Sequence, residues 1–131
     1  MEVCMLRNIF KIIFVLFFSV LMAGVVFAAP PLKIGALFSV SGPASFLGEP
    51  ERNTAEMMVA DINKAGGIKG RKLELIVYDT QGDATKAVQA VNKLIKDDKV
   101  VAIIGPSTTG DSMAVIPVVE KAEIPMISCA A

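Results

Sequence analysis

The 131-residue sequence contains no histidine and no tryptophan, a single tyrosine and two cysteines. Histidine is the usual base that activates a serine or cysteine nucleophile, and it is the commonest partner of cysteine in zinc sites. Its absence therefore argues against a catalytic cysteine and against a zinc site, and we expect the chain to be no enzyme and to hold no metal or other cofactor. Cys129 is the only cysteine outside the apolar N-terminal stretch, and we interpret it as a small buried thiol in a strand.

The chain also has no excess of one charge, because 13 Lys and Arg residues balance 13 Asp and Glu residues. Glu2, Arg7 and Lys11 are the only charged residues before position 29, so the rest of the chain is close to neutral as well. Proteins that bind nucleic acid usually carry a clustered basic face. We expect no nucleic-acid partner.

The one long apolar run lies at the N-terminus. Arg7 and Lys11 precede an almost wholly apolar stretch, Ile12 to Val26, and small residues at 26 and 28 favour cleavage before Ala29. This pattern predicts a secretory signal peptide over residues 1–28. An uncleaved membrane anchor is the alternative, although about 17 apolar residues is the short limit for a span. No cysteine follows Leu21–Gly24, so the lipoprotein signal is missing.

Residues 29–131 show alternating strand and helix patterns. Apolar runs predict four strands, at Leu32–Phe38, Leu73–Tyr78, Val100–Ile104 and Ile124–Ser128. Helical spacing predicts three helices, from Pro50 to Ala65, from Ala84 to Ile95 and from Gly110 to about Ala122. The stretch Ser39–Gly48 is predicted to be a loop, and in the last helix Met113, Ala114, Val118 and Val119 are the expected core residues.

This order of elements is typical of a doubly wound α/β layer with a parallel sheet. Ligands of such sheets bind beyond the carboxyl ends of the strands. In this chain those ends lead into Ser39–Gly48, Asp79–Asp83, Gly105–Gly110 and Cys129–Ala131. We expect any ligand site to be formed by these four segments.

The most informative of them follows the third strand and reads Gly-Pro-Ser-Thr-Thr-Gly over residues 105–110. Its glycine spacing approaches that of a phosphate-binding P-loop, but Asp111 stands where the lysine should be, and a carboxylate would repel the phosphates. The first strand-to-helix turn also lacks the G-x-G-x-x-G pattern of dinucleotide-binding folds. Nucleotide chemistry is therefore not favoured.

A neutral site of hydroxyls and backbone groups remains, which suits a small polar or zwitterionic ligand. Thr108 or Thr109 can offer a hydroxyl and an N–H group to a carboxylate, helped by the positive end of the following helix. The alternative is that these residues only cap that helix. Asp111 complements the helix dipole, and the sequence leaves open whether it also faces the ligand. Leu47 either forms an apolar wall of the site or packs beneath its loop.

Several segments, taken together and in order, resemble one known family. They are Leu32–Gly48 (LKIGALFSVSGPASFLG), Ile62–Leu75 (INKAGGIKGRKLEL), Tyr78–Asp83, Val101–Gly110 and Ile124–Ala131 (IPMISCAA). The chain is similar to the amino-terminal lobe of the branched-chain amino-acid binding proteins, which are type I periplasmic solute-binding proteins of ABC importers. The likeness covers essentially all of residues 29–131. The resemblance implies that these residues form an incomplete amino-terminal lobe and that the second lobe of the family is missing.

The resemblance implies roles for particular residues. The loop after the third strand would hold the ligand α-carboxylate through Thr109, with Thr108 adjacent. The loop after the fourth strand would offer the carbonyl of Ala130 to the ammonium group, and Leu47 would form the apolar wall. The acidic partner of the ammonium usually comes from the second lobe, so we expect weak binding by this chain alone.

Three hypotheses about function follow. The first is the periplasmic binding component of an amino-acid importer, whose partners are a small amino acid or amide and a permease in the inner membrane. The second is a sensor or receptor lobe of the same fold, and the third is a truncated product without function of its own.

Overall fold

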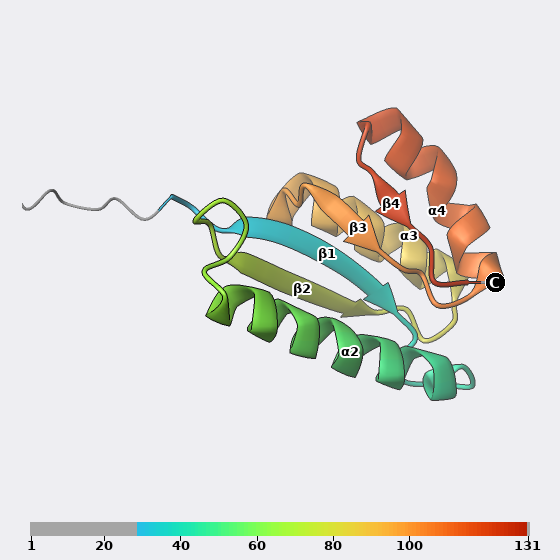
Figure 1. Cartoon of the computed structure of the whole chain (residues 1–131). Helices are drawn as coiled ribbons and strands as arrows, with labels where there is room; N and C mark the ends of the chain where they lie inside the picture. The colour runs from blue at the N-terminus through green and yellow to red at the C-terminus, as the bar shows by residue number, and fades with distance from the viewer. Residues whose placement is uncertain (1–28, 131) are drawn as a thin grey trace, which may run out of the picture.

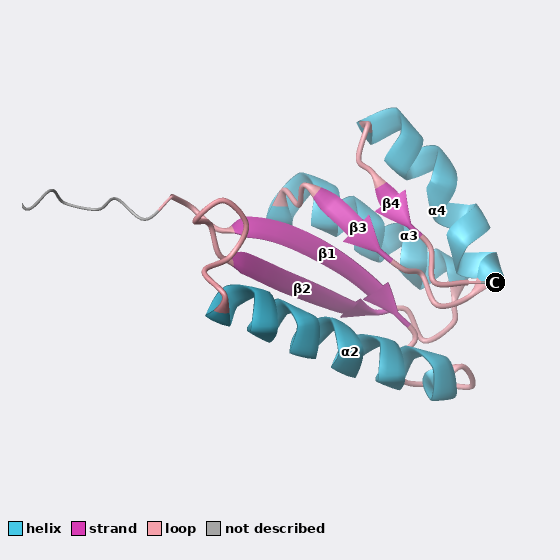
Figure 2. Ribbon diagram, in the orientation of Figure 1, coloured by secondary structure: helices cyan, strands magenta, loops and turns pink. Residues whose placement is uncertain are grey.

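A computed structural model describes residues 29–130. The predicted signal peptide, residues 1–28, and Ala131 lie outside the described residues. Within this part, strands and helices alternate along the chain (Figure 1; Figure 2). In order they are β1 (Leu32–Phe38), α2 (Ser45–Lys64), β2 (Leu73–Asp79), α3 (Ala84–Lys93), a π-helical turn η1 (Leu94–Asp98), β3 (Ala102–Ile104), α4 (Thr109–Ala122) and β4 (Met126–Ile127).

The strands form one parallel sheet in the order β2-β1-β3-β4. β1 lies inside the sheet, where it pairs along its whole length with β2 and, from Ile34 to Ala36, with β3. Helix α2 packs against β1 and β2, while α3 and α4 pack against each other behind the sheet (Figure 1). The predicted doubly wound α/β layer is confirmed.

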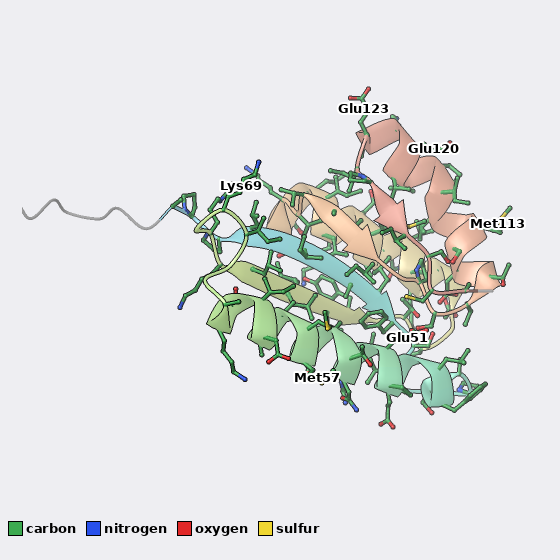
Figure 3. The ribbon with its side chains drawn as sticks, in the orientation of Figure 1. Glu51, Met57, Lys69, Met113, Glu120 and Glu123 are labelled. Atoms are coloured by element: carbon green, nitrogen blue, oxygen red, sulfur yellow. The ribbon has the colours of Figure 1, made fainter. Side chains whose placement is uncertain are left out.

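The core lies between the sheet and the pair α3 and α4. Leu37 from the middle strand is fully buried there, and so is Leu94 from η1. The cluster consists of Leu37, Ala87, Val91, Leu94, Val100, Ile103, Val115 and Val119. The expectation for Met113 is wrong, because its side chain is 65% exposed and points away from the sheet (Figure 3). Asp111 and Ser112 occupy the buried positions of that turn instead.

Helix α2 begins earlier than predicted, at Ser45, so the prediction of a loop up to Gly48 is wrong and Pro50 lies inside the helix. The first turn lies against the end of β1, and a Cβ on Gly48 would come within 2.2 Å of the Ser39 carbonyl oxygen. Only glycine allows this approach. The start of α2 therefore depends on the contact between Gly48 and Ser39, which the position of Pro50 in the sequence does not indicate.

The last two strands are shorter than their apolar runs. The amide of Val100 donates to the carbonyl of Leu94, which closes η1, and Lys99 adopts a positive φ of 56°. Val100 and Val101, which were predicted to begin β3, therefore belong to the connection between η1 and the strand. β4 pairs with β3 only through Met126 and Ile127.

Gly105, directly after β3, allows a test of the close approach between this backbone and that of β1. It has a φ of +92°, and a Cβ there would lie 2.2 Å from the carbonyl oxygen of Leu37. We expect Gly105→Ala to lower the free energy of unfolding by about 2 kcal/mol or more, because both the left-handed φ and the clash must be relieved. Urea unfolding followed by circular dichroism measures this loss.

Gly110 offers a matched control, because a Cβ there meets nothing within 4 Å and the residue lies in the first turn of α4. Gly110→Ala should leave the stability unchanged or raise it by up to about 1 kcal/mol. Equal losses in the two variants would contradict the proposed close approach at Gly105.

Candidate functional site

The candidate site lies at the carboxyl ends of the four strands. Because all strands are parallel, the segments after β1, β2, β3 and β4 emerge at the same edge of the sheet. Figure 1 shows the start of α4, the end of the described chain and the tip of β1 on this side. We call this region, residues 39–44, 80–83, 105–112 and 128–130, the carboxyl edge.

A buried chain of side-chain hydrogen bonds runs through the carboxyl edge. Thr80 donates its hydroxyl hydrogen to Oδ2 of Asp111 over 2.8 Å, and its Oγ1 lies 3.0 Å from the Oγ of Ser39. Since a hydroxyl has one hydrogen, Ser39 must be the donor to Thr80. All three side chains are at most 1% exposed. These three residues form one buried hydrogen-bond network.

Ser107 extends this polar network toward α2. Its Oγ accepts the amide hydrogen of Ser39 over 3.0 Å and donates its own hydrogen to the carboxylate of Glu51. Glu51 lies where α2 passes the carboxyl end of β1 (Figure 3). The loop after β3 is thus tied to both β1 and α2.

A second group of hydroxyls joins the start of α4 to the segment after β4. Ser112 donates to the carbonyl of Thr108 over 2.9 Å, which leaves Ser128 as the donor in its 2.7 Å contact with Ser112. The amide of Ala130 donates to Ser128 over 3.1 Å. The amide of Cys129 donates to the carbonyl of Pro106 over 3.1 Å. The end of the described chain is therefore held next to the loop after β3.

The structure brings three of the four predicted site residues to the carboxyl edge. Thr108 is the N-cap of α4 and accepts the amide hydrogen of Asp111 over 3.2 Å, so the capping role is present. Thr109 is the exposed first residue of the helix, and Ala130 lies next to Ser128. Leu47 is 39% exposed and belongs to the first turn of α2 rather than to a loop.

Sequence reasoning missed the residues that hold the carboxyl edge together, namely Ser39, Thr80, Ser112 and Ser128. A signal was present, because Ser39, Thr80 and Ser128 are hydroxyl residues that each directly follow a strand. The burial of Asp111 also answers the open question about its direction: the carboxylate points inward to Thr80 and not to solvent.

Asp79, the last residue of β2, holds the loop after β1 from the outside. Ser41 donates its hydroxyl to Oδ2 over 2.5 Å and its amide to Oδ1 over 3.2 Å, and the amide of Gln81 donates to Oδ1 over 3.0 Å. Partial burial raises the pKa of Asp79, but these hydrogen bonds stabilise the carboxylate and together lower its pKa below the ordinary value.

The interpretation of Cys129 as a buried thiol in a strand is wrong. The residue is exposed and follows β4, because that strand ends at Ile127. Partial burial of its sulfur, together with the nearby carboxylate of Glu51, raises the pKa of the Cys129 thiol. At neutral pH it is therefore a weak nucleophile.

An apolar groove of about 690 Å³ lies between α2 and the sheet face that α2 covers only in part. Met58 of α2 is 50% exposed at this groove, and Ile127 is 73% exposed. Its lining consists of Ile34, Phe38, Pro50, Glu51, Thr54, Ala55, Met58, Val59, Ile62, Ile68, Leu73, Leu75, Ala102, Ile103, Ile104, Pro125, Ile127 and Cys129. Few polar groups reach it, so it differs in chemistry from the carboxyl edge.

In the part of the chain from 29 to 130, no three side chains of His, Cys, Asp or Glu come together in a way that could hold a metal ion. None of the helices in the same part combines the length and the hydropathy that a membrane crossing requires.

A parallel sheet with hydroxyl-bearing loops along its carboxyl edge has the arrangement in which α/β folds place their ligand sites. The family profile described as "Periplasmic binding protein" matches residues 31–131, and the chain belongs to this family. Its four-stranded sheet and helices correspond to one lobe of the type I fold.

Individual relatives agree with this assignment. The Leu/Ile/Val-binding protein of Escherichia coli K12 is 36% identical over 103 residues, which are 79% of this chain and 28% of that protein. The solved structure of LivJ, the branched-chain amino acid transporter substrate binding protein of Streptococcus pneumoniae in complex with isoleucine, matches with a TM-score of 0.75 and 34% identity. That match covers 77% of this chain and 29% of LivJ.

A third relative carries a different description. The solved structure of an extracellular ligand-binding receptor from Rhodopseudomonas palustris HaA2 matches with a TM-score of 0.67 and 34% identity, over 77% of this chain and 26% of that one. The chain thus spans little more than a quarter of the length of the relatives it matches.

The pKa of Asp79 leads to a prediction about pH. Because this pKa is lower in the folded chain than the ordinary value of 3.8, its hydrogen bonds contribute stability above that value and lose it as the pH falls through the folded pKa. We expect the free energy of unfolding to fall less steeply in Asp79→Asn than in the wild type between about pH 5 and pH 2. Urea unfolding at a series of pH values measures both slopes.

The same substitution at Asp61, an exposed carboxylate on α2 whose partner is the exposed Lys64, serves as the matched control and should change the profile less than Asp79→Asn does. Identical profiles for the wild type and Asp79→Asn would show that the contacts of Asp79 with Ser41 and Gln81 do not stabilise the fold.

Proposed function

We propose that this chain is the amino-terminal ligand-binding lobe of an extracytoplasmic solute-binding protein that delivers branched-chain or related amino acids to an ABC importer. The observation that carries the proposal is the hydroxyl-rich carboxyl edge, in a chain 34% identical to a LivJ protein solved with isoleucine. In this role the chain binds and releases its ligand without changing it chemically, as its relatives are binding proteins.

The ligand carboxylate binds at the start of α4. Thr108 accepts a hydrogen bond from Asp111, so its own hydroxyl hydrogen can be donated to a ligand oxygen. Thr109 follows in the first turn, where amide hydrogens point out of the helix and the helix dipole favours an anion. Because the Asp111 carboxylate is turned inward, it does not occupy this position.

The other two predicted residues complete the site. The carbonyl of Ala130 accepts a hydrogen bond from the ligand ammonium group, and the bond from the Ala130 amide to Ser128 supports its orientation. Leu47, partly exposed in the first turn of α2, forms an apolar wall. A second lobe closes over the ligand from the other side.

The proposed function also requires export of the protein and docking on a membrane partner. Residues 1–28 direct the chain to the periplasm, where the closed protein docks on a permease of the inner membrane. A receptor that reports amino acids or amides is the second candidate, because one relative is described as an extracellular ligand-binding receptor. A gene neighbourhood with permease and ATPase genes favours transport, and one with a two-component system favours the receptor.

A titration with isoleucine tests the site. The residues of the carboxyl edge contact a ligand from one side only, and association costs several kcal/mol of lost freedom, so we expect binding weaker than about 1 mM. In nuclear magnetic resonance spectra of the 131-residue chain, isoleucine should shift the amide signals of Thr109 and Gly110. Thr109→Val, which lacks the hydroxyl, should reduce the affinity by about tenfold.

Isoleucinamide is the matched ligand control, because it keeps the side chain and the ammonium group but has no carboxylate. It should leave the Thr109 and Gly110 signals in place. Equal shifts with both compounds, or shifts confined to the apolar groove, would contradict the proposed site, and micromolar affinity would contradict the expected weak binding from one side.

A further inference from the structure

Thr80 forms hydrogen bonds with several elements, although its side chain does not reach the solvent. It is fully buried directly after β2, its amide donates to the carbonyl of Phe38 over 2.9 Å, and its carbonyl accepts the amide hydrogen of Asp83 over 3.0 Å. Its hydroxyl accepts from Ser39 and donates to Asp111. Thr80 therefore links the end of β1, the N-cap of α3 and the first turn of α4.

The hydrogen-bond partner of Thr80 is the Asp111 carboxylate, which lies in the first turn of α4. Asp111 is the third residue of α4, its amide is bound to the Thr108 hydroxyl, and its side chain is 1% exposed. A carboxylate in the first turn of a helix is attracted to the same amide groups that would bind an anionic ligand. If Asp111 turned outward, it would repel a ligand carboxylate, so its inward direction matters.

The hydroxyl of Thr80 donates a hydrogen bond to the inward-facing carboxylate of Asp111. The backbone of Asp111 and the cap at Thr108 are linked directly, so a change in the side-chain position of Asp111 alters the loop that carries Thr108. The hydroxyl of Thr80 also satisfies the buried carboxylate, which is costly to leave without a partner. The effect of Thr80 on the carboxyl edge is thus both steric and electrostatic.

We propose that Thr80 is a positioning residue, whose hydroxyl holds Asp111 inside the protein and thereby fixes the first turn of α4, with Thr108 and Thr109, for a ligand carboxylate. This inference rests on the proposed function. Thr80 itself does not touch the ligand. It acts through Asp111, which lies 31 positions further along the chain.

Amide hydrogen exchange of the 131-residue chain without any ligand tests the positioning. Thr80→Val keeps the shape of the side chain and removes its hydroxyl. We expect the Asp111 and Ser112 amides to exchange about tenfold faster in this variant, while Val91 in α3 and Val119 at the far end of α4 change less than about threefold. Thr80→Ser, which keeps the hydroxyl, should behave like the wild type.

Thr85→Val is the matched control, because it makes the same chemical change at an exposed position of α3. Uniformly faster exchange at all four amides in Thr80→Val would show that Thr80 only stabilises the fold, and would overturn the proposal. If Thr80→Val does not fold, Asp111→Ala removes the other partner of the same bond and must give the same selective effect. Unchanged exchange at Ser112 in that variant would also overturn the proposal.

Isoleucine then separates the positioning from the function. We expect Thr80→Val to weaken the isoleucine-induced shift of the Gly110 amide by about fivefold in affinity, and Thr80→Ser to stay within about twofold of the wild type. If the wild type shows no shift with isoleucine, the proposed function fails. The exchange rates still decide whether Thr80 positions α4.

Discussion

Polar groups buried at the carboxyl edge have to find their hydrogen-bond partners inside the protein. A buried hydroxyl or carboxylate without a partner costs several kcal/mol, so the loops that carry these groups cannot move independently. Ser39, Thr80 and Asp111 come from three different segments of the chain and are satisfied by one another. Among the described residues no buried side-chain nitrogen or oxygen lacks a partner. This constraint links the order of the strands to the geometry of the candidate site.

The middle strand makes the constraint possible. β1 is hydrogen-bonded on both sides, so its carboxyl end is placed between those of β2 and β3. Ser39, the next residue, therefore reaches Thr80 on one side and Ser107 on the other. Ser107 carries the connection on to Glu51 of α2. A rigid lobe with an open, polar edge is what a two-lobed binding protein needs, because the ligand is then recognised by groups that are already in place.

Local patterns were enough to predict the order of the elements. The bounds of β1 and the start of α3 agree with the prediction, because Pro31 and Ser39 delimit an apolar run and Asp83 caps the helix through Lys86. What could not be predicted depends on contacts between distant residues. The early start of α2 requires Gly48 to approach Ser39, and the burial of Asp111 requires Thr80. The exposure of Met113 follows from the inward turn of its neighbours Asp111 and Ser112.

The apolar groove beside α2 and the carboxyl edge differ in the kind of surface they expose, and this difference has a thermal consequence. Removing water from an apolar surface lowers the heat capacity, whereas pairing a small charged ligand with hydroxyls and amides changes it little. Any molecule that covered Met58 and Ile127 in the groove would therefore bind with an enthalpy that becomes more favourable as the temperature rises. An amino acid held at Thr108 and Thr109 would bind with a nearly constant enthalpy.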